Sequence, residues 1–179
     1  NNTRLGTFYV EEAPAPLGIQ VYYDRANSAC ALIDPEAVDY SLLDNTRVLH
    51  LTGITPALGA GAHEVFQRLL AHAEARDLPL SFDVNYRAKL WSAREAASQI
   101  EEACRQAHIL FCARADATEL WNFRGSPEAI LRQMAVRFQE EHTPKTLVLT
   151  LGAEGSAHLH DGEYAYTPAI PTEGSSRFG

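Results

Sequence analysis

Residues 80–87 read LSFDVNYR, and this stretch indicates the type of fold. Its first five residues have the β-branched, aromatic and apolar character of a short buried strand, and polar residues follow at once. Similar short apolar strands are predicted on either side, at residues 48–51, 109–112 and 146–150. Helices are predicted between them at residues 62–76, 92–104, 116–121 and 126–140. Strands that alternate with helices in this order predict an α/β fold with a doubly wound, mostly parallel sheet.

Local signals mark where several of these elements begin and turn. Ser92 with Glu95 three residues later is the pattern of a capping box at a helix start. Ser126 followed by Pro127 is the pattern of an N-cap with proline in the first helical turn. Residues 156–167 contain Asp161-Gly162, which predicts an antiparallel hairpin after the last parallel strand.

The first quarter of the chain has a different character. Residues 6–11 (GTFYVE) and 19–25 (IQVYYDR) are predicted as two strands, joined by the turn-rich link APAPLG at residues 13–18. Two strands alone are marginally stable in water. We therefore expect this pair to lie on another part of the protein or to pair with further strands.

Composition excludes some classes of function. The 179 residues are 46% apolar and 21% charged, as in an ordinary globular protein. A net charge of −8 with scattered arginines argues against a nucleic-acid partner. No apolar run approaches the roughly 18 residues of a membrane span. We expect no signal peptide, because the given sequence lacks the pattern of a basic start followed by an apolar core. Three cysteines without a paired spacing, Cys30, Cys104 and Cys112, are expected to be reduced, as in the cytoplasm.

Polar and glycine residues follow every predicted parallel strand. Because the carboxyl ends of parallel strands share one edge of a sheet, and ligands bind beyond that edge, these residues are expected to form a site. They are Thr52, Gly53 and Thr55 after the first strand, Asp83, Asn85, Tyr86 and Arg87 after the second, Arg114 and Asp116 after the third, and Thr150, Gly152 and Gly155 after the fourth.

Each of these signals has two interpretations. The guanidinium of Arg87 suits a carboxylate or phosphate ligand, or it pairs with Asp83 and holds a loop together. Residues 150–155 (TLGAEG) let backbone amides approach a nucleotide, although a simple turn between strands is the commoner origin of such a pattern.

The histidines are less informative. His158 and His160 share one face of a strand but lack a third metal ligand nearby in sequence, so we expect an exposed pair rather than a metal site. His50, inside an apolar strand, is predicted to be a core histidine.

Four segments, in order along the chain, resemble one family. Residues 49–58 (LHLTGITPAL) resemble the segment "hLSGITPAL" of 2-keto-3-deoxygluconate kinases, and residues 81–91 (SFDVNYRAKLW) resemble their "FDVNYRxKLW". Residues 21–29 (VYYDRANSA) are similar to the lid segment "YYxRxxSA", and residues 150–155 match "TxGxxG". The chain thus resembles the ribokinase-like (PfkB) carbohydrate kinases, and particularly their 2-keto-3-deoxygluconate branch.

The resemblance implies a role for each part. Residues 1–29 would belong to a β-sheet lid, through which a homodimer can form, and residues 30–179 to the α/β kinase core. Tyr22, together with Phe8 or Tyr9, would contact the sugar, and Arg25 and Arg87 would bind the carboxylate of a sugar acid. The nucleotide site, for ATP with Mg²⁺, would be lined by Thr150, Gly152 and Gly155.

The chain also departs from the family pattern. Asp24 stands where the family has its lid arginine, and Arg25 follows it. The family's metal-arranging Asn-x-x-Glu falls on residues 113–116, where only an acid, Asp116, corresponds. Residues 177–179 look like the approach to the family's GAGD motif, so the catalytic aspartate is expected beyond Gly179 and no catalytic residue is assigned in this chain.

We therefore expect the chain to be a fragment that is inactive alone, from an enzyme that phosphorylates 2-keto-3-deoxygluconate at a primary hydroxyl. Two alternatives stay open. One is another PfkB sugar kinase, for fructose or ribose, in which Arg87 would lack a carboxylate partner. The other is a non-catalytic remnant that binds sugar acids.

Overall fold

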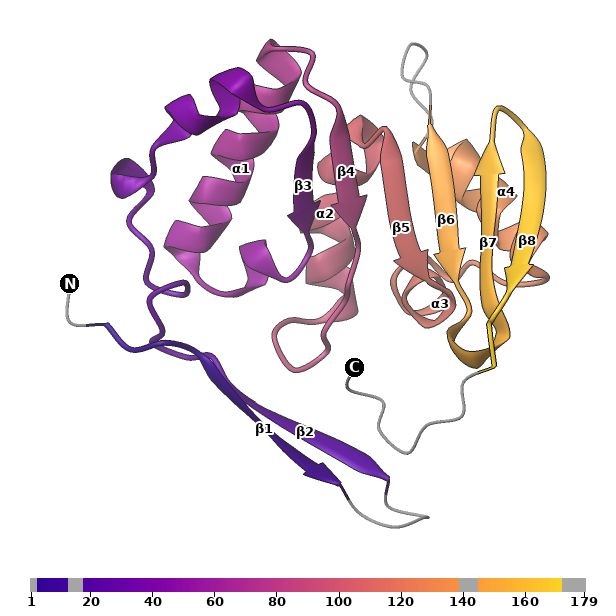
Figure 1. The fold of residues 1–179 in the computed structure, drawn as a ribbon, viewed down its shortest axis with the longest axis horizontal. Coiled ribbons are helices and arrows are strands. Elements are labelled where there is room, and N and C mark those ends of the chain that lie inside the picture. Colours follow the sequence, from indigo (N-terminus) through magenta and orange to yellow (C-terminus); the bar gives the residue numbers. More distant parts are fainter. Residues whose placement is uncertain (1–2, 13–17, 139–144, 172–179) are drawn as a thin grey trace.

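A computed structural model describes residues 3–12, 18–138 and 145–171. Its main sheet has six strands in the order β3-β4-β5-β6-β7-β8 (Figure 1). The first four are parallel, and the last two are added antiparallel. Their bounds are β3 Leu49–Thr52, β4 Leu80–Asp83, β5 Ile109–Ala113, β6 Thr146–Thr150, β7 Gly155–His160 and β8 Glu163–Pro168.

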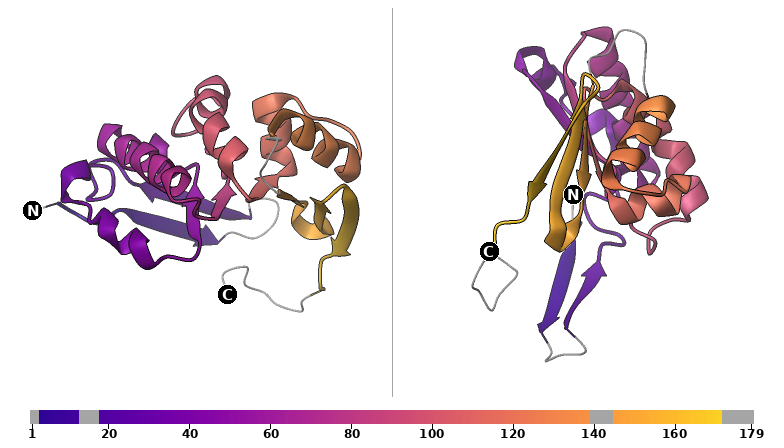
Figure 2. Two further views of the ribbon diagram at one scale, coloured as in Figure 1. Left: turned by 90° about the horizontal axis from the view of Figure 1, so that it is seen from above. Right: turned by 90° about the vertical axis from the view of Figure 1, so that its right-hand side faces the viewer.

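Helices connect the parallel strands. The α-helices are α1 Ala60–Ala75, α2 Ala93–Gln106, α3 Arg114–Trp121 and α4 Pro127–Phe138, and short 3₁₀ turns cover Pro35–Ala37, Tyr40–Asn45, Thr55–Ala57 and Gly152–Glu154. Because each parallel strand is added beside the preceding one in the same direction, right-handed crossovers put α1, α2 and α4 on one face of the sheet. Figure 2 shows these helices on that face, and no α-helix of the described residues covers the opposite face.

The core lies between the sheet and this helical layer. Alternate strand residues such as Phe82, Leu110 and Leu149 are fully buried and meet Phe66 of α1 and Met134 of α4. This alternation sends the intervening residues to the opposite face, where Ile109 is 38% exposed. The α/β fold with a mostly parallel sheet is therefore confirmed.

A second, two-stranded antiparallel sheet is formed by β1 (Thr7–Glu12) and β2 (Ile19–Asp24). This β1–β2 hairpin lies beyond the carboxyl ends of β3 and β4, which is the edge where ligands bind in open α/β sheets (Figures 1 and 2). The hairpin exposes large side chains, including Phe8 at 62% and Tyr9 at 65%. It is the small β unit that the sequence predicts.

Several local predictions are also confirmed. The capping box of Ser92 and Glu95 is present at the start of α2, and the Ser126 hydroxyl accepts a hydrogen bond from Ala129 N at the start of α4. Asp161 and Gly162 both have positive φ angles, of 48° and 81°, as a two-residue hairpin turn requires.

Three expectations fall partly or wholly outside the described residues. They are the link at residues 13–18, apart from Gly18, the end of the helix predicted at residues 126–140, and the motif approach at residues 177–179. The three cysteines are free thiols, and Cys104 and Cys112 are buried. Among the described helices, none has the length and apolar character needed to cross a bilayer.

Candidate functional site

A cavity of about 390 Å³ opens at the carboxyl edge of the parallel strands. Three residues predicted from separate segments meet in its wall: Arg87 from the loop after β4, Asp116 from α3 and Thr150 from the end of β6. The full lining is His50, Asp83, Asn85, Arg87, Phe111, Ala113, Asp116 and Thr150.

Strand register explains why these side chains converge. Asp83 of β4 is aligned with Phe111 of β5, and Ala113 of β5 with Thr150 of β6. Since residues that are neighbours across a sheet point to the same face, all four project on the face opposite to the helices. The cavity therefore lies on that face and reaches the edge where the strands end.

The carboxylate of Asp116 is tied to the loop after β4. Its Oδ2 accepts a 3.0 Å hydrogen bond from the main-chain N–H of Tyr86. Burial raises the pKa of Asp116, and the nearby charge of Asp83 raises it further, while the Tyr86 N–H and the Arg87 guanidinium act in the opposite direction. The site thus holds a carboxyl group whose ionised form is destabilised by burial.

Asp83 is a second half-buried carboxylate in the same cavity. Burial raises its pKa, against the opposing effects of His50, Arg87 and the main-chain N–H of Asn85. Two carboxylates and one guanidinium at one edge can receive a ligand that carries both hydroxyl groups and negative charge, since carboxylates accept from hydroxyls and guanidinium pairs with anions.

The guanidinium of Arg87 makes a local contact. Its Nη1 donates to the carbonyl oxygen of Tyr86 at 2.8 Å. Within the described part of the chain, no ion pair within 4.0 Å joins it to Asp83 or to another carboxylate. The interpretation in which Arg87 pairs with Asp83 to hold a loop therefore finds no support in this geometry.

The prediction that His50 is a core histidine is wrong. His50 is exposed, because it stands between Leu49 and Leu51, whose side chains are buried on the helical face. Its Nδ1 lies 3.0 Å from the hydroxyl oxygen of Ser81, and its ring lines the cavity. The two-residue period of a strand would have placed it on the site face.

The segment from Thr150 to Gly155 joins β6 to β7 through a short 3₁₀ turn. Gly152 has φ +62° with open space around its Cβ position. Gly155 has φ +117°, and a Cβ there would lie 2.1 Å from the carbonyl oxygen of Thr167. Both glycines are thus explained by the turn itself, and only Thr150 of this segment lines the cavity.

Arg114, the first residue of α3, also holds this turn in place. Its guanidinium donates to both carboxylate oxygens of Glu154, at 2.9 and 3.3 Å.

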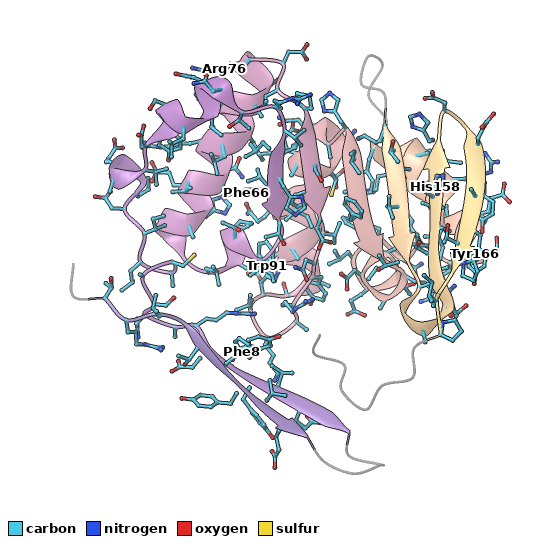
Figure 3. The ribbon with its side chains drawn as sticks, viewed as in Figure 1. Phe8, Phe66, Arg76, Trp91, His158 and Tyr166 are labelled. Atoms are coloured by element: carbon cyan, nitrogen blue, oxygen red, sulfur yellow. The ribbon has the colours of Figure 1, made fainter. Side chains whose placement is uncertain are left out.

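The predicted sugar-contacting residues divide between the two faces of the β1–β2 hairpin. Phe8 is paired with Tyr23, and Tyr9 with Tyr22, so each pair shares a face and Phe8 is opposite to Tyr22. The Arg25 guanidinium stacks over the Tyr23 ring at 3.9 Å from its centroid, on the Phe8 side. Tyr22 and Tyr9 can therefore act together, whereas Phe8 acts with Tyr23 and Arg25. Figure 3 shows Phe8 on the hairpin, below the main sheet in this view.

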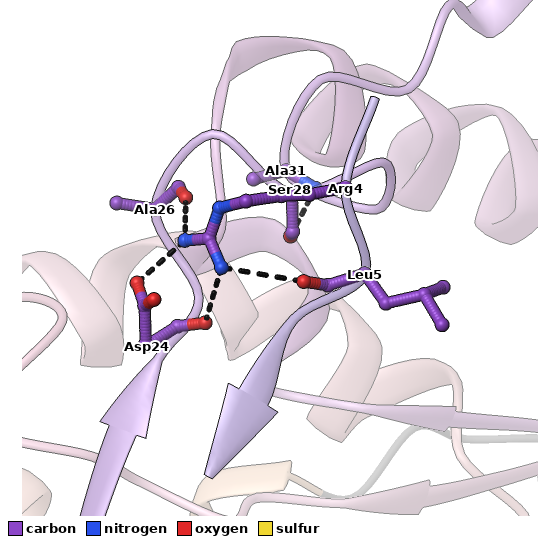
Figure 4. Close-up of polar contacts among 6 residues, drawn as sticks. All are labelled: Arg4, Leu5, Asp24, Ala26, Ser28 and Ala31. Atoms are coloured by element: carbon purple, nitrogen blue, oxygen red, sulfur yellow. Dashed lines mark hydrogen bonds and ion pairs between the residues drawn. The ribbon is translucent and has the colours of Figure 1, made fainter. Parts of the chain in front are cut away.

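Asp24, at the end of β2, has a structural partner. Asp24 pairs with Arg4, whose guanidinium also donates to the carbonyl oxygens of Leu5 and Ala26 (Figure 4). Ser28 is buried beside this cluster, and its hydroxyl accepts from Ala31 N. Asp24 therefore closes the base of the hairpin.

Histidines outside the cavity make local contacts. His160 lies 2.9 Å from the hydroxyl of Thr146 and 3.4 Å from Asp161. In the described ranges, no group of three or more His, Cys, Asp or Glu side chains is placed to hold a metal ion. Of the pair that the sequence predicts to be exposed, His160 is exposed and His158 is partly exposed.

Comparisons with known proteins identify relatives over almost the whole chain. The chain is 29% identical over 173 residues to the 2-dehydro-3-deoxygalactonokinase of Haloferax volcanii, covering 97% of this chain and 53% of that protein. It is 29% identical over 167 residues to the 2-dehydro-3-deoxygluconokinase of Thermoproteus tenax, covering 92% of this chain and 49% of that protein. The chain thus spans about half the length of the curated relatives it matches.

Solved structures agree on the fold. The crystal structure of 2-dehydro-3-deoxygluconokinase from Thermotoga maritima superposes with a TM-score of 0.82 at 24% identity, covering 91% of this chain and 53% of that one. The sequence profile described as pfkB family carbohydrate kinase matches residues 1–176. The chain therefore belongs to the pfkB family of carbohydrate kinases.

Proposed function

We propose that the protein to which this chain belongs transfers the γ-phosphoryl group of ATP to a primary hydroxyl of a sugar acid, 2-keto-3-deoxygluconate (2-dehydro-3-deoxygluconate). The observation that carries this proposal is the guanidinium of Arg87 in a cavity at the sheet edge, without an ion-pair partner in the described part of the chain. A carboxylate on the sugar supplies that partner and binds through two parallel hydrogen bonds. Relatives named for two such sugar acids support the choice of substrate class.

The β1–β2 hairpin is the proposed lid, and residues 30–179 belong to the kinase core. Tyr22 with Tyr9 on one face, or Phe8 and Arg25 on the other, would cover the sugar when the hairpin closes over the sheet edge. Closure excludes water and so limits hydrolysis of ATP. The exposed strand edges of the hairpin also support a homodimer formed through it.

Thr150, Gly152 and Gly155 are the proposed nucleotide side of the site. Thr150 lines the cavity, and the positive φ of Gly152 with open space beside it leaves the backbone of the turn accessible to a phosphate or a ring. ATP binding in this position would place its phosphates near the carboxyl edge, within the cavity that also holds Arg87. The reaction would occur in the cytoplasm, where free thiols stay reduced.

Mg²⁺ fits the donor set that this chain provides. It binds through one or two carboxylates together with substrate phosphates, rather than in a cage of protein ligands. Asp116 is the proposed protein ligand, through the carboxylate oxygen that does not accept from Tyr86 N. Asp83 lines the same cavity and is the second carboxylate available to the ion. When bound, the ion would neutralise charge on the phosphates. We assign no catalytic base within residues 1–179.

The test is ATP turnover by the full-length gene product against a panel of sugars. The panel holds 2-keto-3-deoxygluconate, 2-keto-3-deoxygalactonate, fructose and ribose, with ADP release as the readout and phosphorus NMR to locate the new phosphate. The proposal expects the first two to be phosphorylated at a primary hydroxyl much faster than the neutral sugars. Faster turnover of fructose or ribose would overturn the substrate class. Sugar-acid binding without any turnover would indicate a binding protein and contradict the kinase.

A further inference from the structure

The backbone of Asn85, in the loop after β4, has the left-handed conformation at the point where the chain leaves the sheet. Val84 still pairs with β5, its N–H donating to Phe111 O at 3.0 Å. Asn85 then has a φ of 44°, a conformation that Asn adopts more readily than most residues with a side chain. From this position Asn85 Nδ2 donates a 3.2 Å hydrogen bond to the hydroxyl oxygen of Thr52, at the end of β3. The loop is thus attached to the neighbouring strand through one side-chain pair.

The position of Arg87 depends on this loop rather than on contacts of its own. Within the described part of the chain, its guanidinium bonds only to the carbonyl oxygen of the preceding residue, Tyr86. The main chain of Tyr86 is held on one side by Asp116. On the other side, the Thr52–Asn85 hydrogen bond holds the residue before it. We therefore expect that removing either attachment would change where the guanidinium lies.

The end of β3 is closely fitted to the same loop. Gly53 N donates to Asp83 O at 2.9 Å, and a Cβ on Gly53 would lie 2.2 Å from the carbonyl oxygen of Val84. Thr52 is aligned with Asp83 in the parallel pair. The Thr52 hydroxyl therefore has a fixed main-chain position from which to hold the Asn85 amide.

We propose that Thr52 is a positioning residue for sugar-acid binding: its hydroxyl, by accepting from Asn85, directs Arg87 into the cavity. This inference rests on the proposed function, in which Arg87 binds the carboxylate of the sugar. Thr52 acts through Asn85 and the loop and does not touch the reacting atoms. Because the interaction is made equally in the ground state and the transition state, its loss should raise KM for the sugar and leave kcat unchanged.

The experiment compares Thr52→Val, which replaces the hydroxyl with a methyl group, and Thr52→Ser, which keeps it, in the full-length gene product. Losing one neutral hydrogen bond predicts a rise of about 3- to 10-fold in KM for 2-keto-3-deoxygluconate in Thr52→Val. KM for ATP and kcat should stay within about twofold. Thr52→Ser should restore KM for the sugar to within about twofold of the wild type.

A double variant identifies the route of the effect. In an Arg87→Ala background, adding Thr52→Val should change KM for the sugar by less than about twofold, because the group that Thr52 positions is gone. An effect of the same size in both backgrounds would overturn the proposal. An equal rise in KM for ATP would do so as well, since it would indicate general damage to the sheet edge.

A second readout does not depend on the substrate. Hydrogen exchange of the amides of residues 85–87 should be faster in Thr52→Val than in the wild type and in Thr52→Ser. Unchanged exchange would overturn the positioning role whatever the enzyme phosphorylates. If the wild type acts only on neutral sugars, the proposed function fails, and the exchange measurement still decides whether Thr52 holds the loop.

Discussion

The main-chain N–H of Tyr86 donates to Oδ2 of Asp116 at 3.0 Å, across a sequence separation of 30 residues. This bond connects the two parts of the site that the sequence suggested separately, the loop that carries Arg87 and the helix that carries the acid. A carboxylate used in this way has a structural role in addition to the metal role that we propose. The two roles can be separated by substitution.

Replacing Asp116 by Asn should raise the stability of the protein at pH 7. Burial raises the pKa of Asp116 in the folded state. The unfolded chain ionises first as pH rises, so wild-type stability falls as pH increases from the ordinary Asp pKa, about 3.9, through the folded value. An amide oxygen can still accept from Tyr86 N, and it carries no charge to desolvate.

Thermal unfolding as a function of pH tests this expectation. The midpoint of Asp116→Asn should exceed that of the wild type at pH 7, and the difference should shrink towards about pH 3, where the wild-type carboxyl is neutral in both states. Asp116→Ala serves as the control, because it removes the charge and the acceptor together and leaves the Tyr86 N–H without a partner. A lower midpoint for Asp116→Asn at pH 7 would contradict the assignment.

Gly53→Ala should distort the site as well as destabilise the protein. The added Cβ would lie 2.2 Å from the backbone oxygen of Val84, whose main chain is held to β5 by the bond from Val84 N to Phe111 O. Forced overpacking of this kind costs about 1–3 kcal/mol. Gly6→Ala is the matched control, because the nearest atom to its Cβ position is at 3.6 Å. Denaturant unfolding should separate the two variants, and equal midpoints would contradict the close approach of Gly53 to the Val84 carbonyl.

The capping box at the start of α2 gives a test of local structure away from the site. The Ser92 hydroxyl accepts from Glu95 N at 3.3 Å, and the Glu95 carboxylate accepts from Ser92 N at 3.0 Å. Ser92→Ala should lower the free energy of unfolding by about 1 kcal/mol. Ser98→Ala, an exposed position inside the same helix, should be neutral or slightly stabilising. Equal effects of the two substitutions would contradict the capping role.

Much of this structure is predictable from local sequence signals. Periodicity located the strands and helices, and the rule that ligands bind at carboxyl ends brought Arg87, Asp116 and Thr150 to one edge, where the cavity lies. The turn at Asp161-Gly162 was predictable because its residues suit positive φ angles.

Other features depend on three-dimensional geometry that the spacing of residues in the sequence does not determine. The prediction for His50 is wrong because it assumes that an apolar strand is buried on both faces. In the described residues, α-helices cover only one face of the sheet, and His50 is on the other. The division of Phe8 and Tyr22 between opposite faces follows from the hairpin register, which the sequence alone leaves open. The pairing of Asp24 with Arg4 joins residues 20 positions apart, and no local pattern predicts it.

We propose above that Arg87 recognises the carboxylate of a sugar acid that the whole enzyme phosphorylates. The most direct measurement is kcat/KM for 2-keto-3-deoxygluconate and for its neutral analogue with a hydroxymethyl group in place of the carboxylate, in wild type and Arg87→Gln. We predict that the wild type prefers the acid. Losing charge-assisted hydrogen bonds should lower kcat/KM for the acid in Arg87→Gln by about 10- to 100-fold, and that for the neutral analogue by less than about threefold. An equal loss for both sugars, or a wild type that prefers the neutral one, would contradict recognition of the carboxylate by Arg87.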